Sequence, residues 1–138
     1  FNALRIEKGY RSAGADMTTE HTPEAAGLSF AVKSSKQDFV GKKALDQRKC
    51  TSRLRTIKFD DPAAVVLGKE PVTVDGKVVG YVTSAGWSPT IGACLAYAWL
   101  PSDLPDLTAV EVDYLRTSYG ALVISDPVVD PEMARIKQ

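Results

Sequence analysis

Histidine is almost missing from this sequence, and its scarcity removes several kinds of chemistry. The single histidine, His21, lies in the polar stretch Thr-Glu-His-Thr-Pro over residues 19–23. A histidine-rich zinc or iron site is therefore not available from this chain, and a Ser-His-Asp triad would need His21 as its base. We interpret His21 as an exposed or capping loop residue, and we assign no catalytic residue and no metal ligand to the chain.

Cysteine and long apolar runs are scarce as well. Cys50 and Cys94 lie far apart in the sequence, without a CxxC or metal-ligand spacing. We expect two reduced thiols, as is usual inside cells. No apolar run approaches the ~20 residues that a membrane-spanning helix needs, and no signal peptide is visible. These observations predict a cytoplasmic protein. Because the chain opens at Phe1 inside an amphipathic pattern, we expect it to be a fragment of a longer polypeptide.

An excess of charge of one sign is also lacking. Seventeen basic residues balance seventeen acidic ones, and 44% of the residues are hydrophobic, as is typical of globular domains. A neutral chain gives no reason to expect nucleic acid or an anionic membrane as a partner. The sequence has no Gly-x-Gly-x-x-Gly motif and no phosphate-binding loop, so it carries no nucleotide-binding signature of its own.

Residues 1–50 combine short helices, turns and one strand. Small polar residues and glycines interrupt the apolar pattern there, so we expect mostly loop between the elements. The predicted elements are a helix over 3–8 that ends at Gly9, a turn over 23–26 capped by Thr22, a strand over 28–32 and a charged helix over 41–49.

From about residue 52 the apolar pattern changes to period two, which is typical of strands. Asp75-Gly76 lies between two such runs and is a strong signal for a tight hairpin. The predicted strands cover 54–59, 71–74, 77–83, 109–115 and 119–124, and the apolar run 91–100 is either a buried strand or a helix. The sequence therefore predicts an α+β chain that divides near residue 50, with a small antiparallel six-stranded β-barrel as its second part.

Three features could bind a ligand, and each also has a structural interpretation. Glu7 ends the first helix, where a carboxylate can be a solvated surface charge or can accept two parallel N–H donors, such as the amino-pyrimidinone edge of a pterin. Lys33, Lys36, Lys42 and Lys43 form either a solvated face or a site for an anionic group such as a glutamyl tail. The segment 79–89 is either a barrel corner or a ligand-facing turn.

Taken together, these segments resemble the glycine cleavage T-protein family. The version with Glu-Lys-Gly-Tyr-Arg over 7–11 and Asp-Phe-Val-Gly-Lys over 38–42 looks most similar to the C-terminal region of dimethylglycine and sarcosine dehydrogenases. The matching segments, in chain order, are 5–11, 14–17, 20–28, 32–33, 38–42, 44–45, 82–86, 88–89, 126–127 and 130–131. Their order and spacing cover nearly the whole chain.

The resemblance implies a division of the chain and a cofactor. Residues 1–50 would be the end of a folate-binding, aminomethyltransferase-like domain, and residues 51–138 the C-terminal barrel. Such enzymes pass a one-carbon unit to tetrahydrofolate, giving methylenetetrahydrofolate. Glu7 matches the family's pterin-binding glutamate. Lys36 stands nearest to a basic folate-binding residue that is an arginine in the T-protein, and Tyr10, in the same segment as Glu7, is a third candidate contact.

The resemblance also implies what this chain does not hold. The family's catalytic aspartate, and any FAD domain, would lie upstream in the same polypeptide. We therefore expect the chain to be inactive alone and to be part of an oxidative demethylase that uses FAD and tetrahydrofolate. Two alternatives stay open: a fragment of a glycine cleavage aminomethyltransferase without flavin, and a non-catalytic module that keeps the fold and has lost the chemistry.

Overall fold

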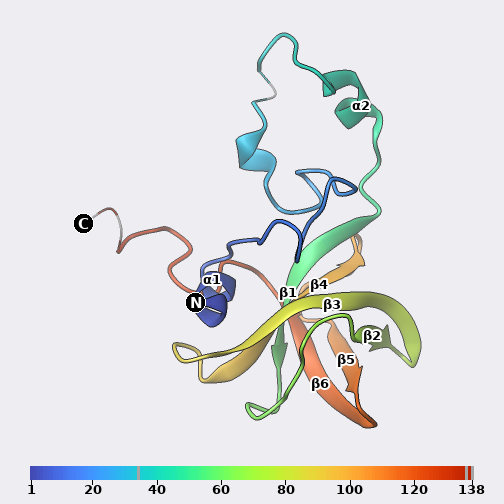
Figure 1. Ribbon diagram of the computed structural model, residues 1–138, viewed down its shortest axis with the longest axis vertical. Coiled ribbons are helices and arrows are strands. Elements are labelled where there is room, and N and C mark those ends of the chain that lie inside the picture. Colours follow the sequence, from blue (N-terminus) through green and yellow to red (C-terminus); the bar gives the residue numbers. More distant parts are fainter. Residues whose placement is uncertain (34, 136, 138) are drawn as a thin grey trace.

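Six antiparallel strands close into a barrel in the computed structural model, which describes residues 1–33, 35–135 and 137 (Figure 1). The strand order around the barrel is β1-β4-β3-β2-β5-β6, so the predicted closed antiparallel barrel is confirmed. The elements are α1 (Asn2–Glu7), η1 (Ser29–Ala31), α2 (Lys42–Gln47), β1 (Ser52–Phe59), β2 (Pro71–Val74), β3 (Lys77–Ser88), β4 (Ala93–Pro101), β5 (Ala109–Tyr114) and β6 (Thr117–Ile124).

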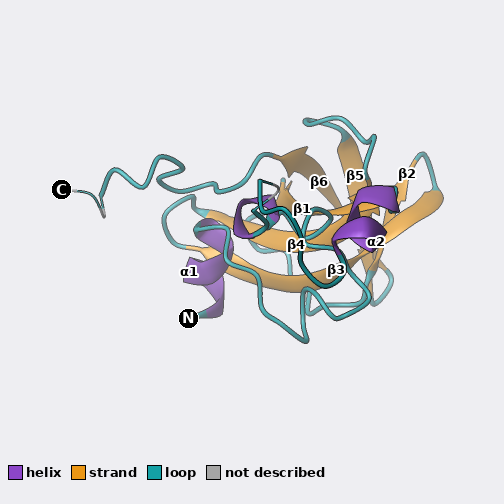
Figure 2. Ribbon diagram, turned by 90° about the horizontal axis from the view of Figure 1, so that it is seen from above, coloured by secondary structure: helices purple, strands orange, loops and turns teal. Residues whose placement is uncertain are grey.

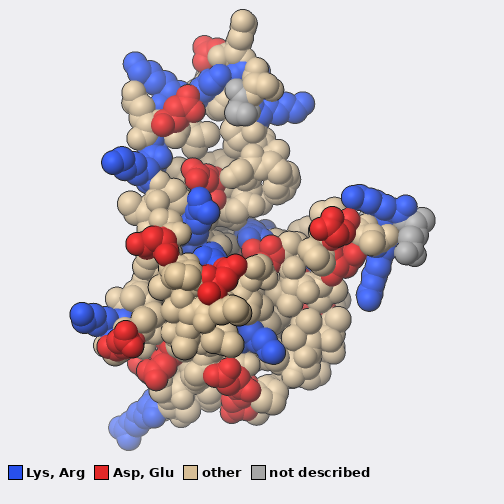
Figure 3. All heavy atoms as spheres, turned by 180° about the vertical axis from the view of Figure 1, so that it is seen from behind, with Lys and Arg blue, Asp and Glu red and all other residues tan. Residues whose placement is uncertain are grey.

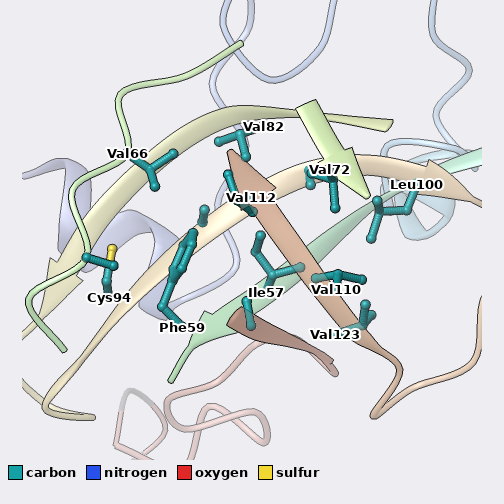
Figure 4. Packing of buried hydrophobic residues seen from close by; sticks show 14 residues of the cluster. Ile57, Phe59, Val66, Val72, Val82, Cys94, Leu100, Val110, Val112 and Val123 are labelled. Atoms are coloured by element: carbon teal, nitrogen blue, oxygen red, sulfur yellow. The ribbon is translucent and has the colours of Figure 1, made fainter. Parts of the chain in front are cut away.

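Alternating side chains fill the barrel interior, as the period-two pattern predicts. Ile57 and Phe59 of β1 point inward and meet Val72, Val82 and Val112 from three other strands (Figure 4). These five side chains are at most 1% exposed. Because the barrel closes on itself, no strand of the set keeps an unpaired edge, which removes a common route to aggregation.

A second hydrophobic cluster lies on the outer side of the barrel. Leu95, Tyr97 and Trp99 of β4 point away from the interior and pack against Ile6 of α1 and Ala26 of the following loop. Eight successive residues of β4 are consequently buried. Burial on both faces explains why the run 91–100 is apolar without alternation, and why the sequence left strand and helix as equal alternatives. The structure shows a strand.

The prediction of a strand over residues 28–32 is wrong. This segment forms the short 3-10 helix η1 instead, in which the Ala31 N–H donates to the Leu28 carbonyl at 3.0 Å. Its side chains do not face a core: Phe30 is 84% exposed. The period-two pattern of this segment is therefore not a buried strand face, because alternation implies a strand only where one face is covered.

The stretch from η1 through α2 stands apart from the barrel. Between residues 29 and 49, no described residue is buried. Figure 1 shows this stretch projecting from the barrel, on the side where β1 begins. Within the part of the chain that the structure describes, no helix has the length and apolar character needed to cross a bilayer.

The two hairpin turns that have only two residues each, between β2 and β3 and between β5 and β6, differ in how well their residues fit the backbone. Asp75 and Gly76 adopt φ values of 51° and 73° between β2 and β3. Leu115 and Arg116 adopt 46° and 72° between β5 and β6. Both turns need left-handed backbone, which glycine and asparagine adopt at little cost and leucine and arginine do not.

We expect the double substitution Leu115→Asn with Arg116→Gly to raise the free energy of unfolding by about 0.5–2 kcal/mol, because it relieves left-handed strain in an exposed turn. Gly76→Ala in the other hairpin is the matched control and should lower stability, since an added Cβ there meets no atom within 4 Å and acts only through φ. Urea unfolding of the 138-residue chain measures both. A double variant less stable than the wild type would contradict this account.

Candidate functional site

Helix α1 carries the candidate glutamate onto the barrel. The helix packs against β3 and β4 (Figure 2), and a Cβ added at Gly86 of β3 would lie 3.4 Å from the Ala3 Cα, so the two backbones approach closely. Gly9, with φ of 79°, turns the chain after the helix, as the sequence predicted. Glu7, in the last turn, is only 4% exposed. Its carboxylate therefore lies at the joint between α1 and the barrel.

Three donors from the end of β3 and the turn after it hold the Glu7 carboxylate. The Ser88 hydroxyl donates to Oε1 at 2.5 Å, the Thr90 N–H donates to Oε1 at 3.1 Å, and the Thr90 hydroxyl donates to Oε2 at 2.9 Å. Burial raises the pKa of Glu7, but these hydrogen bonds outweigh it and bring the pKa below its usual value. Glu7 is thus a desolvated carboxylate that stays ionised at neutral pH.

Arg5, two residues before Glu7 on the same helix, forms a buried ion pair with Asp16 of the following loop. The Arg5 Nη1 donates to the Asp16 Oδ2 at 2.5 Å, and the two side chains are 9% and 0% exposed. The hydroxyls of Thr83 and Ser84 on β3 donate to Asp16 Oδ1 at 2.8 and 2.6 Å. The Ser12 N–H also bonds Oδ2. Burial raises the pKa of Asp16, and these donors together bring the pKa below its usual value.

The C-terminal segment secures the other side of α1. The N–H groups of Val128 and Val129 both donate to the Glu7 carbonyl, at 3.1 and 3.0 Å. Lys8 pairs with Asp130 at 3.1 Å. Carbonyls at a helix end have no partner within the helix, so these backbone donors complete the C-terminal end of α1. Glu7 is therefore fixed through both its side chain and its backbone.

A cavity of about 790 Å³ opens beside this joint. Its walls come from the segment after α1, from the region of η1, from the start of β1 and from the C-terminal segment; the lining residues include Lys8, Tyr10, Arg11, Phe30, Arg53, Asp126 and Met133. Tyr10 is 53% exposed. The arginines are paired with carboxylates: Arg11 with Asp126, and Arg53 with Glu24 at 3.1 Å. Figure 3 likewise shows charges of both signs intermixed over one face of the molecule.

Glu7 and Tyr10 are close in sequence, but only Tyr10 is among the residues that line the cavity, whereas the Glu7 carboxylate faces Ser88 and Thr90. Glu7 lies at the joint and Tyr10 lies three residues later on the cavity wall. Lys36 is exposed in the segment between η1 and α2, which Figure 1 shows well away from α1. The assignment of these three residues to one folate site therefore stays a prediction.

His21 has a structural position. Its Nδ1 accepts the Thr18 N–H at 3.0 Å, so it caps a turn, and its ring stacks on Trp99 with centroids 4.1 Å apart. The interpretation of His21 as a capping residue agrees with this geometry. Sequence reasoning missed the partners of Glu7. The Ser-Pro-Thr segment 88–90 after a long strand was visible, but nothing in its pattern indicated that it faces the first helix.

Comparison with known proteins identifies what this geometry is similar to. Residues 53–130 match the family described as the glycine cleavage T-protein C-terminal barrel domain. The solved structure of the glycine cleavage system aminomethyltransferase T from Bartonella henselae superimposes with a TM-score of 0.84 at 26% sequence identity, covering 94% of this chain and 38% of that chain.

Curated relatives extend well beyond this chain. Mitochondrial dimethylglycine dehydrogenase of Mus musculus is 39% identical over 143 residues, which covers 99% of this chain and 16% of the relative. The Homo sapiens protein of the same name is 39% identical over 141 residues, with 97% and 16% covered. An aminomethyltransferase of Prochlorococcus marinus is 32% identical over 131 residues, with 91% and 35% covered. The chain therefore spans a minor part of each relative.

We expect Asp16→Asn to destabilise the 138-residue chain by about 3–5 kcal/mol, because it leaves the Arg5 guanidinium buried without its counter-charge. Asp113→Asn, at an exposed position of β5, is the control and should change stability by no more than about 0.5 kcal/mol. Chemical denaturation measures both. Equal stabilities for the two variants would show that the ion pair does not hold the N-terminal segment.

The same carboxylates predict how stability depends on pH. The pKa values of Glu7 and Asp16 are lowered by folding, so both groups stabilise the fold above their unfolded pKa values, and this contribution is lost as the pH falls through the folded values. The free energy of unfolding should therefore decline below about pH 5. The decline should be shallower in the double variant Glu7→Gln with Asp16→Asn. An identical slope in the two proteins would contradict the assignment.

Proposed function

The chain belongs to the glycine cleavage T-protein family, and on that premise we propose that it is the C-terminal, tetrahydrofolate-binding part of a larger one-carbon enzyme of the dimethylglycine dehydrogenase kind. The parent protein would oxidatively demethylate a methylated amine such as dimethylglycine or sarcosine and pass the carbon to tetrahydrofolate. Residues 1–50 would complete a folate-binding domain, and residues 51–138 would form the barrel against which that domain packs.

Two observations support a longer parent. The relatives that share 39% identity with nearly the whole chain are about six times its length, since it covers 16% of them. The stretch 29–49 contains no described residue that is buried, yet it carries large apolar side chains: Phe30 is 84% and Val40 is 104% exposed. Apolar side chains in such a stretch gain stability when another domain covers them. An upstream domain of the same polypeptide is the proposed partner, with no role for nucleic acid or a membrane.

The single observation that carries the folate proposal is the state of Glu7. A desolvated, ionised carboxylate is suited to bind the N–H groups of an amino-pyrimidinone ring. Two carboxylate oxygens offer about four acceptor positions, and three are used by Ser88 and Thr90, so one position remains on Oε2. The residues present therefore fit one part of tetrahydrofolate, its pterin edge.

Each proposed folate residue has a distinct task. Glu7 would orient the pterin, Tyr10 would contribute an aromatic wall from the adjoining cavity, and Lys36 would supply a positive charge for the glutamyl end once an upstream domain repositions its segment. Tetrahydrofolate, when bound, supplies the amine that takes up the one-carbon unit. The acid–base residue of the reaction would come from the upstream part of the polypeptide, so we expect the chain alone not to catalyse turnover. FAD would bind upstream.

A glycine cleavage aminomethyltransferase is the second candidate, because aminomethyltransferases share up to 36% identity with this chain among the cyanobacterial relatives compared and the Bartonella henselae structure superimposes closely. The flavin absorbance of the complete natural protein separates the two candidates, since only the dehydrogenase would contain FAD. A cytoplasmic location belongs to this proposal as well, although the animal relatives are named as mitochondrial.

Tetrahydrofolate titration into the complete natural protein tests the proposal. We expect Glu7→Ala to weaken binding by about 1.5–3 kcal/mol, as for other hydrogen bonds to charged groups, and Glu7→Gln to weaken it without emptying the joint. Glu111→Ala, at an exposed position of β5, is the control and should leave the affinity unchanged. A wild-type protein without affinity for folate would support the non-catalytic module. Normal affinity in both Glu7 variants would remove Glu7 from the site.

A further inference from the structure

The end of β3 brings two hydroxyls and one backbone N–H onto a single side chain of α1. Ser88 is the last residue of β3, and Thr90 lies in the turn that leads to β4 at Ala93. Ser88 is 0% exposed, and its hydroxyl also accepts the Ile91 N–H at 3.1 Å, so the turn itself is rigidly held. All three donors to the Glu7 carboxylate thus come from a three-residue piece of the barrel, 81 to 83 positions away in sequence.

We propose that Ser88 and Thr90 are positioning residues for folate recognition, which orient Glu7 so that Oε2 alone faces the ligand and accepts one N–H from the pterin. This inference rests on the proposed function and deepens it. It gives the barrel an indirect part in cofactor recognition, through Glu7, since neither Ser88 nor Thr90 would contact the cofactor.

The way in which the three donors divide between the two carboxylate oxygens of Glu7 determines how this carboxylate is oriented. Oε1 receives both the Ser88 hydroxyl and the Thr90 N–H, so its two lone pairs are used. Among the residues that the structure describes, Oε2 accepts a hydrogen bond only from the Thr90 hydroxyl, at 2.9 Å. A carboxylate held this way cannot accept two parallel N–H groups through both oxygens without losing a barrel contact. Ligand binding through Oε2 keeps all three contacts.

The basic side chains near Glu7 in the sequence are paired with other carboxylates, so the donors to the Glu7 carboxylate are hydroxyl and amide groups. On α1 and the residue after it, Arg5 is paired with Asp16, and Lys8 is paired with Asp130 of the C-terminal segment. On the segment after α1, Arg11 is paired with Asp126. The hydrogen bonds from Ser88 and Thr90 are the influences that bring the pKa of Glu7 below its usual value, against the opposing effect of burial.

A double-mutant cycle on the complete natural protein tests the inference, with tetrahydrofolate as the probe. Thr90→Val removes the hydroxyl and keeps the backbone N–H, and we expect it to weaken folate binding about 5-fold. The same change in a Glu7→Gln background should have no further effect, because Thr90 acts through Glu7. Thr90→Ser restores the hydroxyl and should bind as the wild type does. Thr117→Val, at an exposed position of β6, is the matched control.

The pH dependence of binding separates positioning from a general loss of structure. Removing the Thr90 hydroxyl raises the pKa of Glu7, so folate affinity of Thr90→Val should decline at a higher pH than in the wild type. Unchanged folate affinity in Thr90→Val would overturn the positioning role while leaving Glu7 as a folate residue. The same follows if Thr90→Val lowers the folate affinity equally in the wild type and in the Glu7→Gln variant. Absence of folate binding by the wild type would overturn both this inference and the proposed function.

Discussion

The buried ion pair between Arg5 and Asp16 is the interaction on which the rest of the structure depends. Both charges are withdrawn from water, and they are compensated by each other and by the hydroxyls of Thr83 and Ser84 on β3. Removing one partner of a buried ion pair is costly, because the remaining charge is left in the interior without a counter-charge or water around it. The ion pair therefore joins the N-terminal segment to one stretch of β3. Because Glu7 follows Arg5 by two residues on α1, this also brings Glu7 to the end of β3.

The outer face of β4 completes this arrangement. Tyr97 is 0% exposed beneath α1, and its hydroxyl donates to the Ile6 carbonyl at 3.3 Å. The Trp99 Nε1 donates to the Asp16 carbonyl at 2.9 Å, while the ring stacks on His21. Apolar burial and backbone hydrogen bonding thus hold together the same two segments that the ion pair joins. In the proposed function, the barrel would support a ligand site whose binding residue, Glu7, comes from outside the barrel.

The sequence predicted the barrel better than it predicted the site. Local geometry determines the alternation in β1 and β5 and the turn at Asp75-Gly76. These strands could therefore be predicted from the sequence. The segment 28–32 has the same alternation, but none of its residues is fully buried, and a single sequence does not reveal which faces are covered. The contacts of Glu7 with Ser88 and Thr90 cross more than eighty positions and come from tertiary packing, which neither spacing nor composition reports. Lys36 remains a prediction, because its segment lies away from Glu7 within this chain.

Glu7 connects the observed structure with the proposed function, since its carboxylate holds α1 on the barrel and, in the proposal, would offer its remaining acceptor position to tetrahydrofolate. The most direct measurement is a crystal structure of the complete natural protein with tetrahydrofolate bound. The account predicts a pterin N–H donor within about 2.7–3.2 Å of Glu7 Oε2, with Ser88 and Thr90 still bonded to the carboxylate. A pterin bound away from Glu7, with the three barrel contacts intact, would show that this carboxylate only holds the helix in place and would contradict the account.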